Sequence, residues 1–262
     1  MKERRFLTRC NMEGLHEIIL ENGEARHLQT VLRLGPGNIV TVIDGHGRYV
    51  EARIVNLDPR KSRVLLTAVS SIHFKDDRLP IALLVALIKW ERMAILVRQV
   101  TECGVHTILP VITDRTVVRP GKNKIERMKE IALQTLKQCG GLHAPDILSP
   151  VPLLQMEQAL RQMKLRPATR LLLSPGNTAN PLVRLALETP LPWAVLIGPE
   201  GGLSDHEKKE LKDMEFLETN LGPRTLRTET AATVTIGILS NCRELVINGI
   251  RHHQVSLSEF QG

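Results

Sequence analysis

Residues 193–207 read WAVLIGPEGGLSDHE, an apolar run followed by a glycine loop and the start of a helix. The run from Trp193 to Ile197 stops at Gly198, which gives it the length and bounds of a buried strand. Ser204 and Glu207 have the spacing of a capping box, so the sequence predicts a helix that runs from there to about Met214. The order of strand, glycine loop and helix is typical of an α/β layer.

The glycine loop is a candidate binding site. Gly201 and Gly202 allow a ligand to approach the backbone, and the first N–H groups of the next helix have no partners inside it. The spacing fits neither the P-loop nor the GxGxxG dinucleotide pattern. Glu200 would repel a phosphate, but it suits hydroxyls, amines or a cationic ligand. The alternative is an ordinary connection between strand and helix, in which the glycines serve packing only.

A second stretch, LGPRTLRTETAA at residues 221–232, repeats this arrangement farther along the chain. Together the two loops resemble those of the SPOUT class of methyltransferases. The pair IGPEGGLS and LGPRTLRTETAA is similar to the family of ribosomal RNA small subunit methyltransferase E. The resemblance extends to Arg4-Arg5-Phe6, to the segment from His27 to Leu34, and to Asp44-Gly45.

The resemblance implies both a fold and an activity. The expected fold is a SPOUT-like α/β domain with a mostly parallel sheet and a trefoil knot, preceded by a small PUA-like β-barrel. The expected activity is methylation of uridine N3 in 16S ribosomal RNA, free or in the small ribosomal subunit, by a homodimer that uses S-adenosylmethionine. Two alternatives stay open: a SPOUT methyltransferase of another rRNA or tRNA base, and an inactive RNA-binding assembly factor.

The resemblance also places the cofactor in a cleft between three loops, which correspond here to residues 172–174, 198–202 and 221–230. Apolar side chains there can sandwich an adenine, and backbone groups freed by glycines can bind its edge and the ribose. The residues expected at the cofactor are Leu172, Leu173, Ser174, Ile197, Gly198, Pro199, Glu200, Gly201, Gly202, Leu221, Gly222, Leu226, Thr228 and Thr230.

The catalytic candidates are Arg227 and Glu229. Methyl transfer from a sulfonium is a direct displacement, so the protein supplies alignment and no metal is expected. Uridine N3 becomes a good nucleophile only after it loses its proton, and Arg227 could stabilise the anion beside O2 or O4. Glu229 or Glu200 could orient this arginine or accept the proton. Alternatively, Arg227 and Glu229 form an ion pair at the start of the last helix.

The chain divides into two predicted domains. Residues 1–72 contain short runs rich in β-branched residues, with turn residues such as Asp44-Gly45 between them, which predicts a small β-barrel. The polar segment 70–77 is a plausible linker. Residues 73–250 form the α/β domain, and residues 251–262 a polar tail. Strands are expected at 39–43, 49–55, 63–69, 81–88, 106–112 and 171–173, and helices at 24–34, 91–103, 124–139, 153–163, 181–188 and 229–245.

The net charge of +7 is unevenly distributed. Residues 1–70 hold 11 basic and 8 acidic residues, residues 71–150 hold 12 and 8, and residues 151–262 hold 12 and 12. This balance favours an RNA partner at the front of the chain, although a modest positive charge is common in proteins. Few aromatic residues are available there for base stacking, so contacts to phosphate are expected. The candidates are Arg4, Arg5, Arg26 and Arg33.

No apolar run approaches the roughly 20 residues of a membrane span, which favours a cytoplasmic protein. The four cysteines lack CxxC spacing, so reduced thiols are expected rather than disulfides or a zinc site. One departure from the resembled family lies at Gln138-Cys139-Gly140-Gly141, where the family usually has Gln-Ser-Gly-Arg. The basic residue of that motif is therefore absent from position 141.

Overall fold

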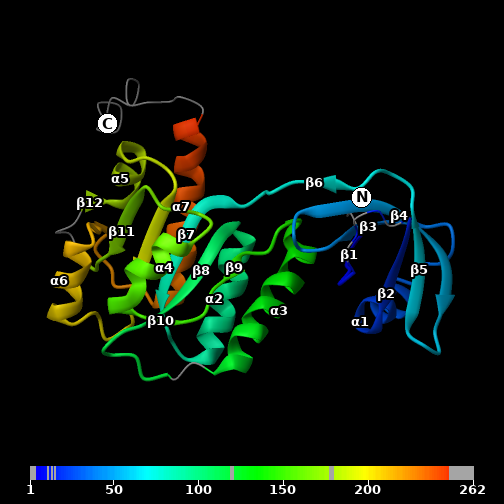
Figure 1. The fold of residues 1–262 in the computed structure, drawn as a ribbon, viewed down its shortest axis with the longest axis horizontal. Coiled ribbons are helices and arrows are strands. Elements are labelled where there is room, and N and C mark those ends of the chain that lie inside the picture. Colours follow the sequence, from blue (N-terminus) through cyan, green and yellow to red (C-terminus); the bar gives the residue numbers. More distant parts are fainter. Residues whose placement is uncertain are drawn as a thin grey trace, which may run out of the picture. The chain divides into compact units, whose positions relative to one another are not determined.

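The computed structural model describes residues 4–10, 12, 14, 16–118, 121–176 and 180–247 (Figure 1). The chain forms two compact units, one of residues 1–78 with 126–145 and the other of residues 79–125 with 146–262. The first unit is therefore discontinuous, because the chain returns to it through the helix α3 (Lys122–Cys139). The tail predicted for residues 251–262 lies outside the described residues.

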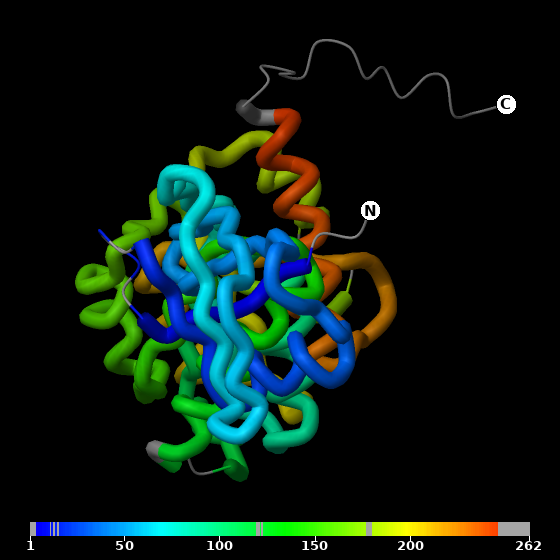
Figure 2. The backbone as a smooth tube through the Cα atoms, turned by 90° about the vertical axis from the view of Figure 1, so that its right-hand side faces the viewer, coloured from blue at the N-terminus to red at the C-terminus, as the bar shows by residue number. Residues whose placement is uncertain are grey.

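A six-stranded sheet forms the first unit, in the order β1-β3-β4-β5-β2 with β6 paired to β4. The consecutive pairs β3–β4 and β4–β5 are antiparallel, as their short connecting turns require. The pair β2–β5 is also antiparallel, whereas β1 runs parallel to β3. Strands β4 and β5 form a long hairpin (Figure 2). The strands are β1 (Arg5–Leu7), β2 (Glu17–Glu21), β3 (Ile39–Ile43), β4 (Arg48–Asp58), β5 (Arg63–Ala68) and β6 (His73–Phe74).

The helix predicted at residues 24–34 consists of two short pieces, α1 (Asn22–Arg26) and a π-helical turn (His27–Val31). Its apolar residues Ala25 and Leu28 are fully buried against the inner side of the sheet. The helix ends before Arg33, whose backbone takes the left-handed conformation with φ 51°. The sheet and this segment together make the apolar core of the first unit.

Residues 126–139 of α3 pack on the first unit. Leu136 is buried with Leu7 and Ile43, in a small cluster separate from the main core of the sheet. Lys137 forms an ion pair with Glu24, which also accepts a hydrogen bond from the backbone N–H of Leu7 at 3.2 Å. These contacts explain why a helix distant in sequence belongs to the N-terminal unit.

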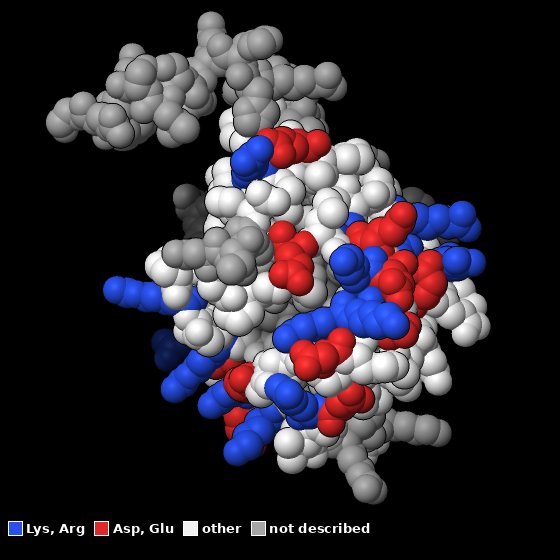
Figure 3. Space-filling model, turned by 90° about the vertical axis from the view of Figure 1, so that its left-hand side faces the viewer, with Lys and Arg blue, Asp and Glu red and all other residues white. Residues whose placement is uncertain are grey.

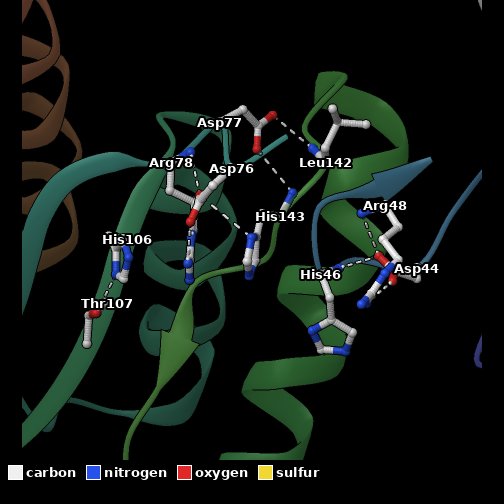
Figure 4. Close-up of polar contacts among 10 residues, drawn as sticks. All are labelled: Asp44, His46, Arg48, Asp76, Asp77, Arg78, His106, Thr107, Leu142 and His143. Carbon is white, nitrogen blue, oxygen red and sulfur yellow. Dashed lines mark hydrogen bonds and ion pairs between the residues drawn. The ribbon is translucent and has the colours of Figure 1, made fainter. Parts of the chain in front are cut away.

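The segment predicted as a linker is bound to the first unit instead. It contains β6, and the Asp77 carboxylate accepts the backbone N–H groups of Leu142 at 2.9 Å and His143 at 3.1 Å (Figure 4). Asp76 pairs with Arg78 at 2.7 Å and lies 3.6 Å from His143. The hydrogen bond from Arg78 lowers the pKa of Asp76 to about 2, and the charge of His143 adds to this effect.

An eight-stranded sheet forms the second unit, in the order β10-β8-β7-β13-β11-β14-β12 with β9 paired to β8, and every described strand pair is parallel (Figure 1). The predicted parallel α/β layer is therefore confirmed. Its strands are β7 (Leu79–Ala86), β8 (Val105–Ile112), β9 (Asp146–Ile147), β10 (Val151–Pro152), β11 (Thr169–Leu173), β12 (Asn180–Pro181), β13 (Trp193–Ile197) and β14 (Leu217–Asn220).

Helices cover both faces of this sheet. On one face, α4 and α6 bury Met156, Leu160 and Leu211 against the strands. On the other, α7 packs against β7 and β13 and against the helices α2 and α5. None of the described helices is long and apolar enough to cross a membrane. The helices are α2 (Trp90–Glu102), η2 (Leu153–Gln155), α4 (Met156–Gln162), α5 (Leu182–Glu188), α6 (Asp205–Asp213) and α7 (Thr228–Ile247).

The strand predicted at residues 193–197 is the central one. β13 is completely buried and pairs along its whole length with β7 and with β11. Because all the strands are parallel, the segments that follow β8, β11, β13 and β14 leave the same edge of the sheet. Both glycine loops are among them, so the fold brings the two motifs together.

Replacing Gly45 with Ala tests the packing of α3 on the first unit. Gly45 has φ 75°, and a Cβ atom there would overlap the side chain of Leu133 on α3. We expect the variant to lose about 1–3 kcal/mol of unfolding free energy, because the left-handed backbone and the overpacked contact both oppose a side chain. Urea denaturation measures this loss.

The matched control is Gly35→Ala, since Gly35 has no positive φ and open space around its Cα hydrogens. This substitution should change the unfolding free energy by less than about 1 kcal/mol. Equal effects of the two substitutions would show that α3 does not press on Gly45.

Candidate active site

A cavity of about 260 Å³ opens at the edge of the second sheet where the parallel strands end. Four loops and the start of α7 surround it, and its inner wall is mainly apolar. Its lining residues are Arg115, Leu172, Leu173, Ser174, Pro175, Ile197, Gly198, Pro199, Glu200, Gly202, Leu203, Lys208, Leu221, Gly222, Arg224, Thr225, Leu226, Thr228 and Ala231.

Most of the residues expected at a cofactor lie in this one cavity. Gly201 and Thr230 are the exceptions among them. A side chain at Gly201 would point at Arg115, with Cβ 3.5 Å from Arg115 Cδ, and Thr230 is exposed on the first turn of α7. The cavity is lined by Leu172, Leu173, Ser174, Ile197, Gly198, Pro199, Glu200, Gly202, Leu221, Gly222, Leu226 and Thr228 of that set.

Two glycines of the cavity wall have left-handed backbones that a side chain would strain. Gly202 has φ 73° and donates its N–H to Pro199 O at 2.9 Å, which closes the glycine loop. Gly222 has φ 105° and donates its N–H to the side chain of Asn220 at 2.9 Å. Glycine adopts such left-handed conformations without strain. The backbone geometry of the two turns therefore explains why each motif has a glycine at this position.

A buried carboxylate joins the glycine loop to the loop after β8. The capping box of Ser204 and Glu207 is confirmed, and Glu207 is only 1% exposed. Its Oε2 accepts the N–H of Ser204 at 2.8 Å, while its Oε1 accepts the N–H of Asp114 at 2.8 Å. Ser204 Oγ donates to Asp114 at 2.6 Å. The sequence predicted the cap, but the tie to Asp114 depends on the tertiary fold.

One guanidinium links Glu200 and Glu229, the two acidic candidates for orienting Arg227 or accepting the proton. Arg92, in the first turn of α2, donates a hydrogen bond to Glu200, and its Nε lies 3.9 Å from Glu229 Oε1. Glu229 is 8% exposed, and its Oε2 has no hydrogen-bond partner among the described residues. The alternative in which Arg227 pairs with Glu229 is not seen among the described residues: Arg92 lies beside Glu229 instead, and Arg227 is exposed.

The sequence alone did not single out Arg92, nor three cations that line the cavity: Arg115, Lys208 and Arg224. A signal for two of them was present, since Arg92 and Arg115 each follow a buried strand of the parallel sheet within a few residues. On the face of the second unit in Figure 3, basic side chains are interspersed with acidic ones. Charge totals along the chain could not reveal which of these cations meet at the cavity.

The arginines expected to bind RNA lie in the first unit. Arg4, Arg26 and Arg33 are exposed. Arg5 is half-buried, and its guanidinium donates to the carbonyl oxygens of Gly140 and, at 3.5 Å, of Gly141. Arg5 thus fixes the segment that follows α3, a role that its sequence context did not suggest.

Two protein-family models match most of the chain. The family described as RNA methyltransferase domain matches residues 75–240, and the RNA methyltransferase PUA domain matches residues 20–66. The chain therefore belongs to this family of RNA methyltransferases. The PUA-like character expected for the N-terminal region is confirmed.

Named relatives point to one member of that family. Ribosomal RNA small subunit methyltransferase E of Synechocystis is 29% identical over 84% of this chain and 71% of its own length. The enzyme of that name from Neisseria gonorrhoeae, whose crystal structure contains S-adenosyl methionine, is 28% identical with TM-score 0.78 over 91% of this chain and 97% of its own. A putative methyltransferase of Legionella pneumophila with bound SAM has TM-score 0.78 and 29% identity over 92% of this chain and 98% of its own.

Replacing Glu207 with Ala tests the hydrogen bonds by which this carboxylate connects the glycine loop to the loop after β8. The change leaves two backbone N–H groups without their charged acceptor, so we expect it to lower the unfolding free energy by about 3 kcal/mol. The cavity should lose its shape as well, because the glycine loop would no longer be fixed to Asp114. Thermal denaturation and a ligand-binding titration measure the two effects.

Glu210→Ala is the control on the same helix, because Glu210 is partly exposed and its nearest basic partner, His206, is 4.0 Å away. It should change stability by less than about 0.5 kcal/mol. If Glu207→Ala behaves like this control, the buried carboxylate does not hold the site.

Proposed function

We propose that this chain transfers a methyl group from S-adenosylmethionine to N3 of a uridine in 16S ribosomal RNA. The observation that carries the proposal is the cavity where both glycine loops and the end of β11 meet. Two of the relatives described above bear the name of a small-subunit rRNA methyltransferase, and two neighbours were solved with this cofactor. A cytoplasmic location is part of the proposal, since the substrate is ribosomal RNA.

The lining of the cavity fits the proposed cofactor. Leu173, Leu221 and Leu226 offer apolar surfaces on which an adenine can stack, and Gly202 and Gly222 keep the backbone open for close contact. Glu200 supplies a carboxylate for hydroxyl or amine groups. When bound, the cofactor provides an activated methyl group on a sulfonium, so the protein needs only to align the two reactants.

The residues at the mouth of the cavity would promote loss of the uridine N3 proton. Arg227 lies between Leu226 and Thr228, which both line the cavity, and its permanent charge can stabilise the uridine anion at O2 or O4. Glu200 also lines the cavity, so it is better situated than Glu229 to accept the proton. Glu229 then acts with Arg92 to orient Glu200.

Two further features belong to the proposal. The first unit supplies RNA affinity through Arg4, Arg26 and Arg33, which are exposed cations suited to phosphate. The trefoil knot of SPOUT domains is expected in the C-terminal segment. There the chain leaves β14, close to one edge of the sheet, and α7 then packs against the central strands β7 and β13.

Replacing Arg227 with Ala tests the proposed chemistry. We expect the rate of methyl transfer to fall about 30-fold to 1000-fold, the usual cost of a contact that acts mainly in the transition state. Binding of S-adenosylmethionine should be unchanged, because the arginine acts on the uridine. The rate should partly recover at alkaline pH, where solution ionises N3 without help. Transfer of radiolabelled methyl from pH 7 to 10 measures both effects.

Arg184→Ala is the matched control, since Arg184 is an exposed arginine on α5 paired with Glu188. Its rate and pH profile should equal those of the unchanged protein. An Arg227→Ala protein that binds both substrates, but whose slow rate stays constant as the pH rises, would refute the role in uridine ionisation.

The protein is also expected to form a homodimer through α7. This helix buries Ile236 and Leu239 inside the second unit, yet Val234 on another side is 38% exposed, and Ile238 borders a second shallow hollow. Apolar surface on several sides of one helix favours association with a second copy. Analytical ultracentrifugation should give the dimer mass at micromolar concentration, and a monomer there would contradict the expectation.

A further inference from the structure

Three cations from three segments lie around the mouth of the cavity. Arg115 comes from the loop after β8, Lys208 from α6 and Arg224 from the loop after β14. We call these three residues the cationic rim. All are exposed, and Glu200, the acidic residue in the lining, is already paired with Arg92. The mouth of the cavity is therefore positive, although two of the three cations come from residues 151–262, which as a whole carry no net charge.

Arg115 is the most firmly held member of the rim. Its neighbour Asp114 is bound by Glu207 and Ser204, and Thr113 and Thr116 close the turn around it with a backbone hydrogen bond of 2.9 Å. The guanidinium donates to Gly201 O, and the aliphatic stem lies over the Gly201 backbone. The hydrogen bond to Gly201 O uses only part of the five N–H donors of the guanidinium. The side chain is therefore fixed in place and still has donors left for an anion.

The other two members are less constrained. Lys208 forms a surface ion pair with Asp205 at 3.6 Å, an interaction of little strength in water. Arg224 has no hydrogen-bond or ion-pair partner within the described residues. Neither side chain is needed to hold the loops together, so both are available to a ligand at the cavity.

The charge of the rim indicates which ligand it suits. The proposed cofactor carries a sulfonium cation, which three nearby cations do not favour. The single carboxylate of the cofactor could pair with only one of the three cations, whereas an RNA strand offers a phosphate at every nucleotide. We infer that the cationic rim binds backbone phosphates beside the target nucleotide while its base enters the cavity. This inference rests on the proposed function and extends the RNA contact to the second unit.

The test compares the variants Arg115→Gln, Lys208→Gln and Arg224→Gln with Lys209→Gln. Lys209 is exposed on α6 next to Lys208 but does not line the cavity, so its variant changes the total charge equally. The probes are small-subunit rRNA transcribed in vitro and poly(U), each titrated from 50 to 300 mM KCl. Each rim variant should reduce the slope of log K against log salt by about 0.7, the value for one phosphate of a single strand.

Kinetics and calorimetry complete the test. The rim variants should raise the KM for RNA several-fold with kcat nearly unchanged, and the heat of S-adenosylmethionine binding should equal that of the unchanged protein. Lys209→Gln should alter none of these quantities. The triple variant Arg4→Ala, Arg26→Ala, Arg33→Ala supplies a comparison for phosphate contacts made by the first unit.

The outcomes separate the inference from the function it rests on. Salt slopes of all three rim variants equal to that of Lys209→Gln would overturn the inference, even with methyl transfer intact. Weaker cofactor binding with unchanged salt slopes would assign the rim to the cofactor's carboxylate and would also overturn it. An unchanged protein that binds RNA but gives no heat with S-adenosylmethionine would refute the proposed function instead. Because Arg224 has no partner to lose, its variant stays informative even where Arg115→Gln unfolds.

Discussion

Parallel pairing of the strands is the constraint on which the second unit depends. A parallel pair cannot be closed by a tight turn, so the chain must cross back over the sheet after each strand. All the strands consequently end at the same edge, and the segments that follow β8, β11, β13 and β14 meet there. The two glycine loops, though separated in sequence by α6 and β14, become the walls of one cavity for this reason.

Buried or partly buried charges then fix the loops that this constraint brings together. Glu207 uses both carboxylate oxygens on backbone N–H groups, one from its own helix start and one from the loop after β8. Arg92 connects Glu200 in the glycine loop with Glu229 at the start of α7. In each case the charged group joins segments from different crossovers, so the walls of the cavity are held by long-range contacts rather than by local turn geometry alone.

The first unit shows the same dependence on distant contacts. Its sheet comes from one continuous segment, but Asp77, Lys137 and Arg5 attach the end of α3 and the residues that follow it. Gly45 allows α3 to approach closely, because its missing side chain leaves room for Leu133. The first unit is completed by a helix that follows a strand of the second unit, so a single cut in the chain cannot separate the two.

The sequence by itself determined most of the longer elements and the motifs. Hydrophobic runs such as 193–197 have the period and length of strands, and the Ser204–Glu207 cap follows from side chains three positions apart, so both are local properties. The resemblance of the two glycine motifs supplied the fold class. Only the tertiary structure decided the partners of the charged groups. Arg92 replaced Arg227 beside Glu229, Arg5 bound the residues after α3, and Arg115, Lys208 and Arg224 met at one cavity. A charge acts over a few ångströms in space, and distance along the chain carries no information about which charges the sheet brings that close.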